Sequence, residues 1–327
     1  MALLGEFELI ARYFTRPAGR AVLGVGDDCA LLGVAPGMTL AVSSDMLVEG
    51  RHFVSTVAPE RLGHKALAVN LSDLAACGAR PLAFTLSLAL PAADEAFLAP
   101  FARGLLALAD RHDCELVGGD TTRGPLTIAI TVFGEVAAGT ALLRSGARAC
   151  DDLYVSGTLG DARLALEVLR GRAAASGEAF ARVRRAMEEP QPRVALGLAL
   201  SGLASSAIDV SDGLAGDLGH VLRRSGVAAV VEVDALPRSA ELAAQPDALQ
   251  RECLLSGGDD YELVFTAPVE RREAVARAAY GATTVITRIG RIEPGAGLRF
   301  VDAAGRDLKG PSSSFDHFLA ATPEPSE

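Results

Sequence analysis

Three apolar runs of the sequence end in glycine followed by aspartate, and this pattern is the first sign of chemistry. The runs are "LGVGDD" ending at Asp28, "LVGGD" ending at Asp120 and "LLSGGDD", which contains Asp259. Glycine lets the backbone turn sharply and lets a ligand approach it closely. Each aspartate is expected at a strand end, where a carboxylate must face water or neutralise a cation. Ordinary Gly-Asp turns explain any one of these runs, but three together favour a shared positive ligand.

Two further segments place oxygen-bearing side chains beside apolar strands. These side chains are Ser43, Ser44 and Asp45 in "AVSSDMLVEG", and Asp209, Ser211 and Asp212 in "SAIDVSDG". The second segment is predicted to turn from a strand into a helix. Asp212 alone could act only as the N-cap of that helix, which requires no function.

Asp73 is the most informative single residue, because it interrupts an apolar helical face. If "RLGHKALAVNLSDLAACG" is helical, then Leu62, Ala66, Val69, Asp73 and Ala76 share one stripe. A charged side chain in such a place is rarely left unpaired. It either caps a backbone group, pairs with an arginine, or points at a cation shared with the other aspartates.

The candidate metal ligands are all oxygen atoms, which is the preference of Mg²⁺. A set of Asp28, Asp45, Asp73, Asp120 and Asp209 has too many carboxylates for one magnesium ion and suits several, completed by substrate phosphates. The phosphate loop G-x-x-x-x-G-K-[ST] is absent, and the chain has only two lysines. The residues therefore predict nucleotide chemistry that does not use a P-loop or a protein-kinase mechanism.

Alternating strands and helices must position these residues. In the first half we predict strands at 39–45, 82–91, 114–120 and 125–136, and helices at 59–81 and 97–111. In the second half we predict strand-to-helix units at 153–171 and 206–226, and strands at 228–234, 252–268 and 286–292. This order predicts an α/β chain with mixed sheets. Its expected domains are 1–137 and 151–320, with a linker at 138–150 and a disordered tail at 321–327.

Composition excludes several classes of function. Half of the 327 residues are hydrophobic, 22% are charged, and the formal net charge is −10. An acidic chain is a poor partner for nucleic acid or for an anionic membrane surface, and we expect neither. No run approaches the roughly 20 apolar residues of a membrane span, and the opening "MALLGEFELIARYF" lacks the basic start of a signal peptide. We therefore expect a cytoplasmic protein. The five scattered cysteines indicate neither a disulfide framework nor a zinc site.

A series of segments, in order along the chain, resembles the thiamine-monophosphate kinase family. The segments are "GEFELIARYF", "GVGDDCALL", "AVSSDMLVEGRHF", "HKALAVNLSDLAACGARP", "ELVGGDTTRG", "LLRSGARACDDLYVSGTLGDA", "SAIDVSDGLAGDLGHV", "LSGGDDYELVFT" and "SSSFDHF". The resemblance runs from residue 5 to residue 318. It implies the two-domain fold of aminoimidazole ribonucleotide synthetase-like ATP-binding proteins, with the N-terminal sheet pairing across a homodimer. It also implies phosphorylation of thiamine monophosphate to thiamine diphosphate by ATP.

The resemblance also implies which residues of the motifs bind magnesium, ATP and thiamine monophosphate. The implied magnesium ligands are Asp28, Ser43, Ser44, Asp45, Asp73, Asp120, Asp209 and Asp212. The implied ATP contacts are Gly119, Asp120, Arg144 and Ser211. His52, Asp259 and Phe315 are implied to hold thiamine monophosphate, although the family pattern has glutamate at 259 and tyrosine or tryptophan at 315. Two alternatives stay open: another ATP-dependent enzyme of the same fold, and a non-enzymatic ATP-binding maturation protein.

Overall fold

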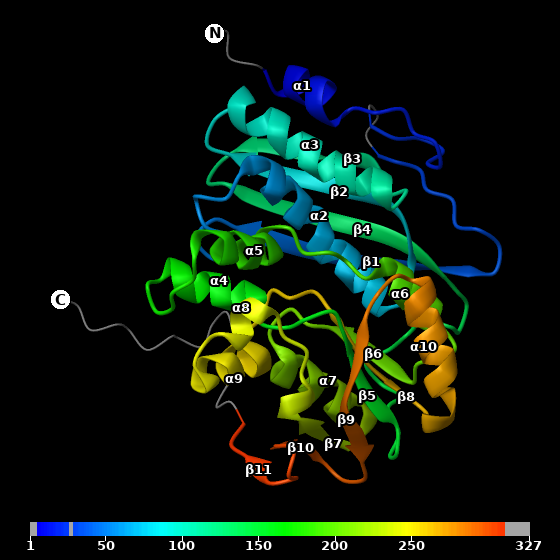
Figure 1. The fold of residues 1–327 in the computed structure, drawn as a ribbon. Coiled ribbons are helices and arrows are strands. Elements are labelled where there is room, and N and C mark those ends of the chain that lie inside the picture. Colours follow the sequence, from blue (N-terminus) through cyan, green and yellow to red (C-terminus); the bar gives the residue numbers. More distant parts are fainter. Residues whose placement is uncertain (1–4, 26–28, 311–327) are drawn as a thin grey trace.

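The computed structural model of the chain describes residues 5–25 and 29–310. Asp28, Phe315 and the predicted tail at 321–327 lie outside the described residues. The first half of the chain forms one mixed sheet and the second half forms another (Figure 1). The prediction of an α/β chain with mixed sheets is therefore confirmed.

The first sheet has four strands in the order β1-β4-β2-β3. The strands are β1 (Met38–Val48), β2 (Arg80–Leu90), β3 (Glu115–Arg123) and β4 (Thr127–Ala137). Strand β4 is antiparallel to both of its neighbours, and β2 is parallel to β3. Helices α2 (Pro59–Ala76) and α3 (Glu95–Arg111) belong to this half, and α1 (Glu6–Leu9) continues into one short π-helical turn at Ile10–Phe14.

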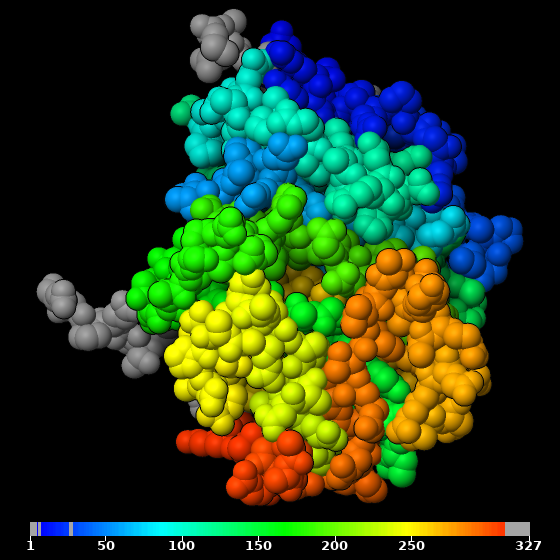
Figure 2. Space-filling view, in the orientation of Figure 1, coloured from blue at the N-terminus to red at the C-terminus, as the bar shows by residue number. Residues whose placement is uncertain are grey.

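The second sheet has seven strands in the order β11-β10-β7-β9-β5-β8-β6. The strands are β5 (Asp152–Ser156), β6 (Ser206–Asp209), β7 (Ala228–Glu232), β8 (Leu263–Ala267), β9 (Ile286–Glu293), β10 (Gly297–Val301) and β11 (Asp307–Leu308). The helices are α4 (Asp161–Leu169), α5 (Gly177–Glu188), α6 (Val194–Leu200), α7 (Leu214–Ser225), α8 (Ala240–Ala243), α9 (Asp247–Ser256) and α10 (Arg272–Gly281). Atoms of α4, α5 and α6 form a band between the two halves in the space-filling view (Figure 2).

Helix α2 lies where the two halves meet. It contacts α3 and β1 of the first half, and α6 and β6 of the second. Close packing against α3 requires glycine: a Cβ atom on Gly63 would lie 2.0 Å from the Phe101 carbonyl oxygen, and one on Gly104 would lie 1.8 Å from that of Glu60. From Leu62 to Ser72 the helix is buried on every side, so it is a core helix rather than an amphipathic surface helix.

Two predictions of local structure are wrong. Residues 252–256 were predicted as the start of a strand, but they form the last turns of α9, and β8 begins only at Leu263. The aspartates also do not all lie at strand ends. Asp45 and Asp120 lie inside β1 and β3, and Asp259 lies in the loop after α9, whereas Asp209 ends β6. The apolar run before Asp259 fits a buried helix as well as a strand, because short apolar runs carry no clear period.

No helix within residues 5–25 and 29–310 is long and apolar enough to cross a membrane.

Candidate active site

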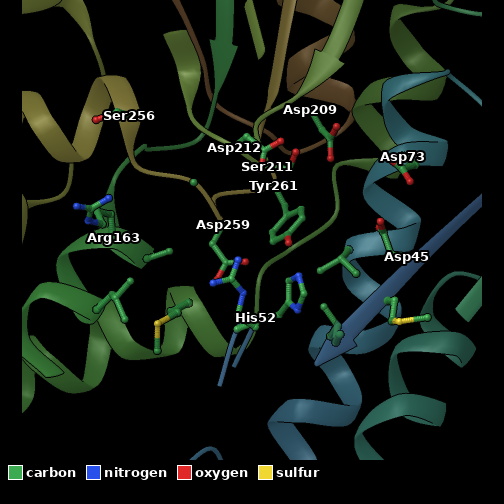
Figure 3. A pocket seen from close by; sticks show the side chains of 18 residues that line it. Asp45, His52, Asp73, Arg163, Asp209, Ser211, Asp212, Ser256, Asp259 and Tyr261 are labelled. Atoms are coloured by element: carbon green, nitrogen blue, oxygen red, sulfur yellow. The ribbon is translucent and has the colours of Figure 1, made fainter. Parts of the chain in front are cut away.

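A cavity of about 430 Å³ lies between the two halves of the molecule. Its polar lining includes Asp45, His52, Asp73, Asp209, Ser211, Asp212, Asp259 and Tyr261. These side chains come from β1, α2, β6 and the loops that follow β1, β6 and α9, and Figure 3 shows them around one common space. Seven residues that the sequence or the resemblance singled out therefore meet in one cavity, although up to 214 positions separate them in the chain.

The segment Asn70–Asp73 of α2 fixes three aspartates at once. The Asn70 side-chain oxygen accepts a hydrogen bond from the Asp45 backbone amide at 3.1 Å. The Ser72 hydroxyl donates to Asp209 at 2.7 Å, and the Ser43 hydroxyl donates to Asp73. Helix α2 thus connects the edge strand β1 of one sheet to the end of β6 in the other. The separation of the carboxylates is set by one rigid element.

Burial makes these carboxylates hard to ionise. Burial, followed by the charges of Asp73 and Asp212, raises the pKa of Asp45 to about 6. Burial, followed by the charge of Asp73, raises the pKa of Asp209 to about 7. The pKa of Asp73 is also raised by burial, while Ser43 and Arg144 act against the shift. No ion pair within the described part of the chain includes Asp45, Asp73 or Asp209.

The donor chemistry of the cavity suits hard cations, because every candidate ligand is an oxygen atom. Within residues 5–25 and 29–310, however, no three Asp, Glu, His or Cys side chains come close enough to hold one metal ion among themselves. The carboxylates instead surround a space large enough for other ligands. Magnesium ions commonly complete their coordination with substrate phosphates and water, so a spread set of carboxylates fits a site shared with phosphates.

The turn after β6 is held by a carboxylate that sequence reasoning did not select. Asp217, in the first turns of α7, accepts hydrogen bonds from the backbone amides of Ser211 at 3.1 Å and Asp212 at 3.0 Å. The N-cap of α7 is Gly213, so Asp212 does not cap the helix through its side chain. Asp212 lines the cavity instead. Asp217 therefore sets the direction of the Ser211–Asp212 turn.

At the other end of the cavity lie His52 and Asp259. The Nδ1 atom of His52 accepts a hydrogen bond from the Val48 backbone amide at 3.0 Å. The neutral ring therefore carries its proton on Nε2. Asp259 forms an ion pair with Lys65 of α2, and its backbone has a positive φ of 72°. Burial and the charge of Asp259 raise the pKa of Tyr261, which lies two residues further on.

A second cavity of about 410 Å³ lies beside the first, and Asp73 and Asp209 line both. Its other polar residues include Ser43 and Arg144. The apolar part of its lining includes Leu142, Leu143 and Ile208. Arg144 is exposed and reduces the upward shift of the Asp73 pKa. A phosphorylated ligand could therefore extend from the aspartates into a partly apolar space that has an arginine beside it.

Three residues that the resemblance implies as magnesium ligands or ATP contacts, Ser44, Gly119 and Asp120, line neither of these two cavities. The Ser44 hydroxyl points to the opposite face of β1, where it donates to the Ile130 carbonyl oxygen at 3.1 Å. Gly119 and Asp120 lie on β3, the opposite edge of the sheet from β1. A row of paired residues crosses this sheet from Met46 through Ala129 and Ser87 to Asp120. Residues in one row share a face, so Asp120 lies on the face opposite to Asp45.

Comparison with known proteins decides the family. The chain matches the family model "AIR synthase related protein, N-terminal domain" at residues 26–136 and its C-terminal counterpart at residues 151–303. It is 46% identical to the thiamine-monophosphate kinase of Salmonella typhimurium over 326 residues, which cover 98% of this chain and 99% of the relative. The chain belongs to the thiamine-monophosphate kinase family.

Solved structures of the family have the same fold. The thiamine-monophosphate kinase from Stenotrophomonas maltophilia superimposes with a TM-score of 0.82 at 45% identity, covering 90% of this chain and 94% of that one. A structure described as AaThiL complexed with AMPPCP and TMP superimposes with a TM-score of 0.76 at 31% identity, covering 88% and 89% of the two chains. The resemblance of the sequence motifs to those of thiamine-monophosphate kinases is therefore confirmed.

For this member of the thiamine-monophosphate kinase family, sequence reasoning missed four residues that organise the site. They are Lys65, Asn70, Ser72 and Asp217. Three of them share α2 with Asp73, and each is a polar residue inside an apolar helix. The segment "HKALAVNLSDLAACG" shows this pattern at Lys65, Asn70 and Ser72 as well as at Asp73. Asp217 follows Asp212 by five residues, and nothing in the sequence marks it as a partner of backbone amides.

Proposed function

We propose that the chain transfers the γ-phosphoryl group of ATP to thiamine monophosphate, giving ADP and thiamine diphosphate. The observation that carries this proposal is the cavity between the halves, where the carboxylates of Asp45, Asp73 and Asp209 and the His52–Asp259 end lie together in a member of a kinase family. AMPPCP is an analogue of ATP, so the complex of the AaThiL relative also supports ATP as the phosphoryl donor.

The proposed reaction is a direct displacement. A phosphate oxygen of thiamine monophosphate attacks the γ-phosphorus atom, and the bond from that phosphorus to the β,γ-bridging oxygen breaks, so that ADP leaves with the bond electrons. The acceptor oxygen is already ionised near neutral pH, so no general base is required. Catalysis then depends on positioning and on neutralising charge in a loose transition state. The site carboxylates are better suited to holding cations than to attacking phosphorus, so no phosphorylated enzyme is expected.

Magnesium ions would supply that neutralisation when bound. The residues proposed to hold them are Asp28, Ser43, Ser44, Asp45, Asp73, Asp120, Asp209 and Asp212. Asp45, Asp73 and Asp209 support the assignment best, because they are half-buried or buried, have raised pKa values and line one cavity. Arg144, Ser211, Gly119 and Asp120 are proposed to contact ATP.

The acceptor is proposed to bind at the His52–Asp259 end of the cavity. His52 can donate from Nε2 to a phosphate oxygen, because its Nδ1 atom is already occupied by the Val48 amide. Asp259 offers a carboxylate to the positively charged thiamine ring system. Phe315 is proposed to stack on that ring system, as aromatic side chains do on cations.

We also propose a homodimer that uses the outer face of the first sheet. Leu40, Val42 and Met46 are 41%, 55% and 57% exposed on this face of β1. A second copy of the sheet would cover this apolar face. The dimer would also explain how Asp120 reaches a site, because Asp120 lies on the same outer face. We therefore propose that the partner subunit's Asp120 completes each site.

The activity is tested by incubating the purified chain with ATP, Mg²⁺ and thiamine monophosphate and measuring thiamine diphosphate. Formation of thiamine diphosphate that depends on all three additions supports the proposal. A folded chain that hydrolyses ATP or phosphorylates a different acceptor would contradict it, and so would a chain that binds ATP without turnover. Rapid quenching with γ-labelled ATP and no acceptor should leave the protein unlabelled.

The shared site is tested by mixing two variants in one dimer. Asp73→Asn and Asp120→Asn homodimers should each lose most of their activity. If the partner subunit's Asp120 serves each site, a purified mixed dimer has one site with both aspartates and recovers about half of wild-type activity. If Asp120 serves its own chain, both sites of the mixed dimer lack one aspartate, and activity stays low. Light scattering should give about twice the 33.8 kDa chain mass.

A further inference from the structure

Lys65 is a buried lysine whose partner lies in the other half of the chain. Its side chain is 2% exposed within α2, and its ammonium group donates to the Asp259 carboxylate, 194 positions later. A buried ammonium group requires a well-placed partner, because leaving it unpaired costs several kcal/mol. Lys65 is one of only two lysines in the chain, so the positive charge at this position is a specific feature.

The backbone around Asp259 is fixed independently of Lys65. The Asp259 amide donates to the Ser211 carbonyl oxygen at 2.8 Å. Both carboxylate oxygens of Asp260 accept from the Gly160 amide, at 2.9 and 3.0 Å, and Glu262 forms an ion pair with Arg193. The loop therefore keeps its path without the lysine. The Asp259 side chain, which is 33% exposed, is the part whose direction depends on Lys65.

Asp259 lies on the wall between two cavities. One is the cavity that contains the carboxylates, and the other is a space of about 330 Å³ lined by the loop at 50–54, α4, α5 and Lys65. His52 also lines both spaces. The second space also has charged groups of both signs, Arg51, Arg170 and Glu188. Lys65 thus holds Asp259 from the side of the second space, while Asp259 still lines the first.

We propose that Lys65 is a positioning residue for the acceptor. It holds the Asp259 carboxylate toward the bound thiamine monophosphate and so sets the affinity for that substrate, not the rate of phosphoryl transfer. The proposal rests on the proposed function. Its physical basis is that an exposed, flexible carboxylate loses rotamer freedom when it binds a ligand, and an ion pair that already fixes its direction lowers that cost.

Because Lys65 neutralises the charge of Asp259, the carboxylate recognises its ligand mainly through a directed hydrogen bond. The ligand group that fits is an N–H donor beside a cationic ring, not a cation alone. Lys65 therefore differs from a lysine that binds the transferred phosphate. Such a lysine would change the rate of phosphoryl transfer, whereas Lys65 acts on the binding of the acceptor.

The test compares Lys65→Met with Arg61→Met. Arg61 lies one turn earlier on α2 and also forms an ion pair with the second half, to Glu188 at 2.8 Å, but it does not line the main cavity. We expect Lys65→Met to raise the KM for thiamine monophosphate about tenfold or more, with kcat within about threefold and the KM for ATP unchanged. Arg61→Met should leave all three values near those of the wild type.

A double-mutant cycle with Asp259→Asn identifies the partner. If Lys65 acts through Asp259, the double variant should have about the same KM as Asp259→Asn alone. Additive effects on KM would overturn the proposal. An unchanged KM in Lys65→Met would also overturn it, and so would a loss confined to kcat, which would indicate direct contact with the reacting phosphate.

Two further measurements keep the test decisive. If Lys65→Met does not fold, as judged by circular dichroism, Lys65→Gln keeps a donor and replaces it in the same assays. Calorimetric titration with thiamine monophosphate alone should show the weaker binding without any turnover. If the wild type makes no thiamine diphosphate, the proposed function fails. If the wild type is active and the Lys65 variants have normal KM values, only the inference about Lys65 fails.

Discussion

The molecule buries acidic side chains in two opposite ways, in two neighbouring regions. In the cavity between the halves, Asp45 and Asp209 have pKa values raised to about 6 and about 7, with serine, amide or carboxylate groups as neighbours. In the α4 region, Glu167 is 4% exposed and forms ion pairs with Arg163, Arg170 and Arg172. Hydrogen bonds from Arg172 and Arg163 outweigh burial and lower its pKa to about 2.

The difference between the two regions distinguishes a carboxylate that stabilises the fold from carboxylates that are available to bind a cation. Glu167 is neutralised by arginines of the same chain, so its pairing is complete before any ligand binds. Within the described residues, Asp45, Asp73 and Asp209 form no ion pair, and their ionised forms cost free energy until a cation arrives. An acidic site without its own cations is unfavourable for folding and useful for binding Mg²⁺.

The largest effect is expected from removing one charge of the cavity. Asp73→Asn keeps the size of the side chain and can still accept from Ser43, but it removes a proposed magnesium ligand. Turnover should fall by about a thousandfold or more, while circular dichroism stays unchanged. Thiamine diphosphate formation at saturating substrates measures the loss. Glu167→Gln is the matched control and should retain activity within about threefold.

The second largest effect concerns Mg²⁺, which should stabilise the folded chain through the aspartates of the cavity and not through Glu167. A cation that binds only the folded chain raises the midpoint of thermal unfolding, and the shift grows with its concentration. Asp209→Asn should reduce that shift strongly. Without Mg²⁺ at pH 8, the same variant should be more stable than the wild type by about 1–3 kcal/mol, because it no longer buries an unpaired charge. A destabilised Asp209→Asn chain in the presence of a chelator would contradict our account of the cavity.

Replacing Glu167 should change the stability of the folded chain in the opposite direction to replacing Asp209. Its folded pKa lies below the unfolded value of about 4.3, so it contributes stability above that pH, and the contribution is lost as the pH falls toward 2. Glu167→Gln should therefore destabilise the chain by about 1–3 kcal/mol at pH 7, with no added effect of Mg²⁺. Urea unfolding at pH 7 and at pH 3 measures the difference. Equal losses at both values would show that lost packing, not charge, explains the change.

The smallest effect is expected at an ion pair on the surface. Glu60 and Arg103 join α2 to α3, and their side chains are 53% and 61% exposed. Exposed pairs of this kind contribute little, because water already solvates both charges. Glu60→Gln should leave both the free energy of unfolding and the activity close to those of the wild type. A loss as large as that of Glu167→Gln would show that the α2–α3 contact is more sensitive to charge than its exposure implies.

Sequence patterns located most of the elements, because helices and strands impose a local period. The apolar period of 59–81 predicted α2, although the helix ends at Ala76 and β2 already begins at Arg80, and Asp73 does share a face with buried residues. The strand predicted over 82–91 agrees with β2, which spans Arg80–Leu90. The start of the run at 252–268 was assigned incorrectly, because a short apolar segment between loops does not distinguish a helix from a strand.

The chemistry of the site can be read from the amino-acid sequence alone. Many aspartates, two lysines, the absence of a P-loop and the ordered series of family motifs were all readable along the chain. Those features depend on residue type and local spacing, which a sequence states directly. They were sufficient to predict an acidic nucleotide site and to identify the family.

Which of these residues meet depends on how the chain folds. The fold brought Asp45, Asp73 and Asp209 to one cavity, joined Lys65 to Asp259, and placed Asp120 on the far edge and opposite face of the first sheet. Side-chain periods of 3.6 or 2 residues fix a face within one helix or strand, but strand order and helix packing are set by contacts between distant segments. Ser72 reaches Asp209 because α2 is buried between the two sheets, and no local pattern contains that information.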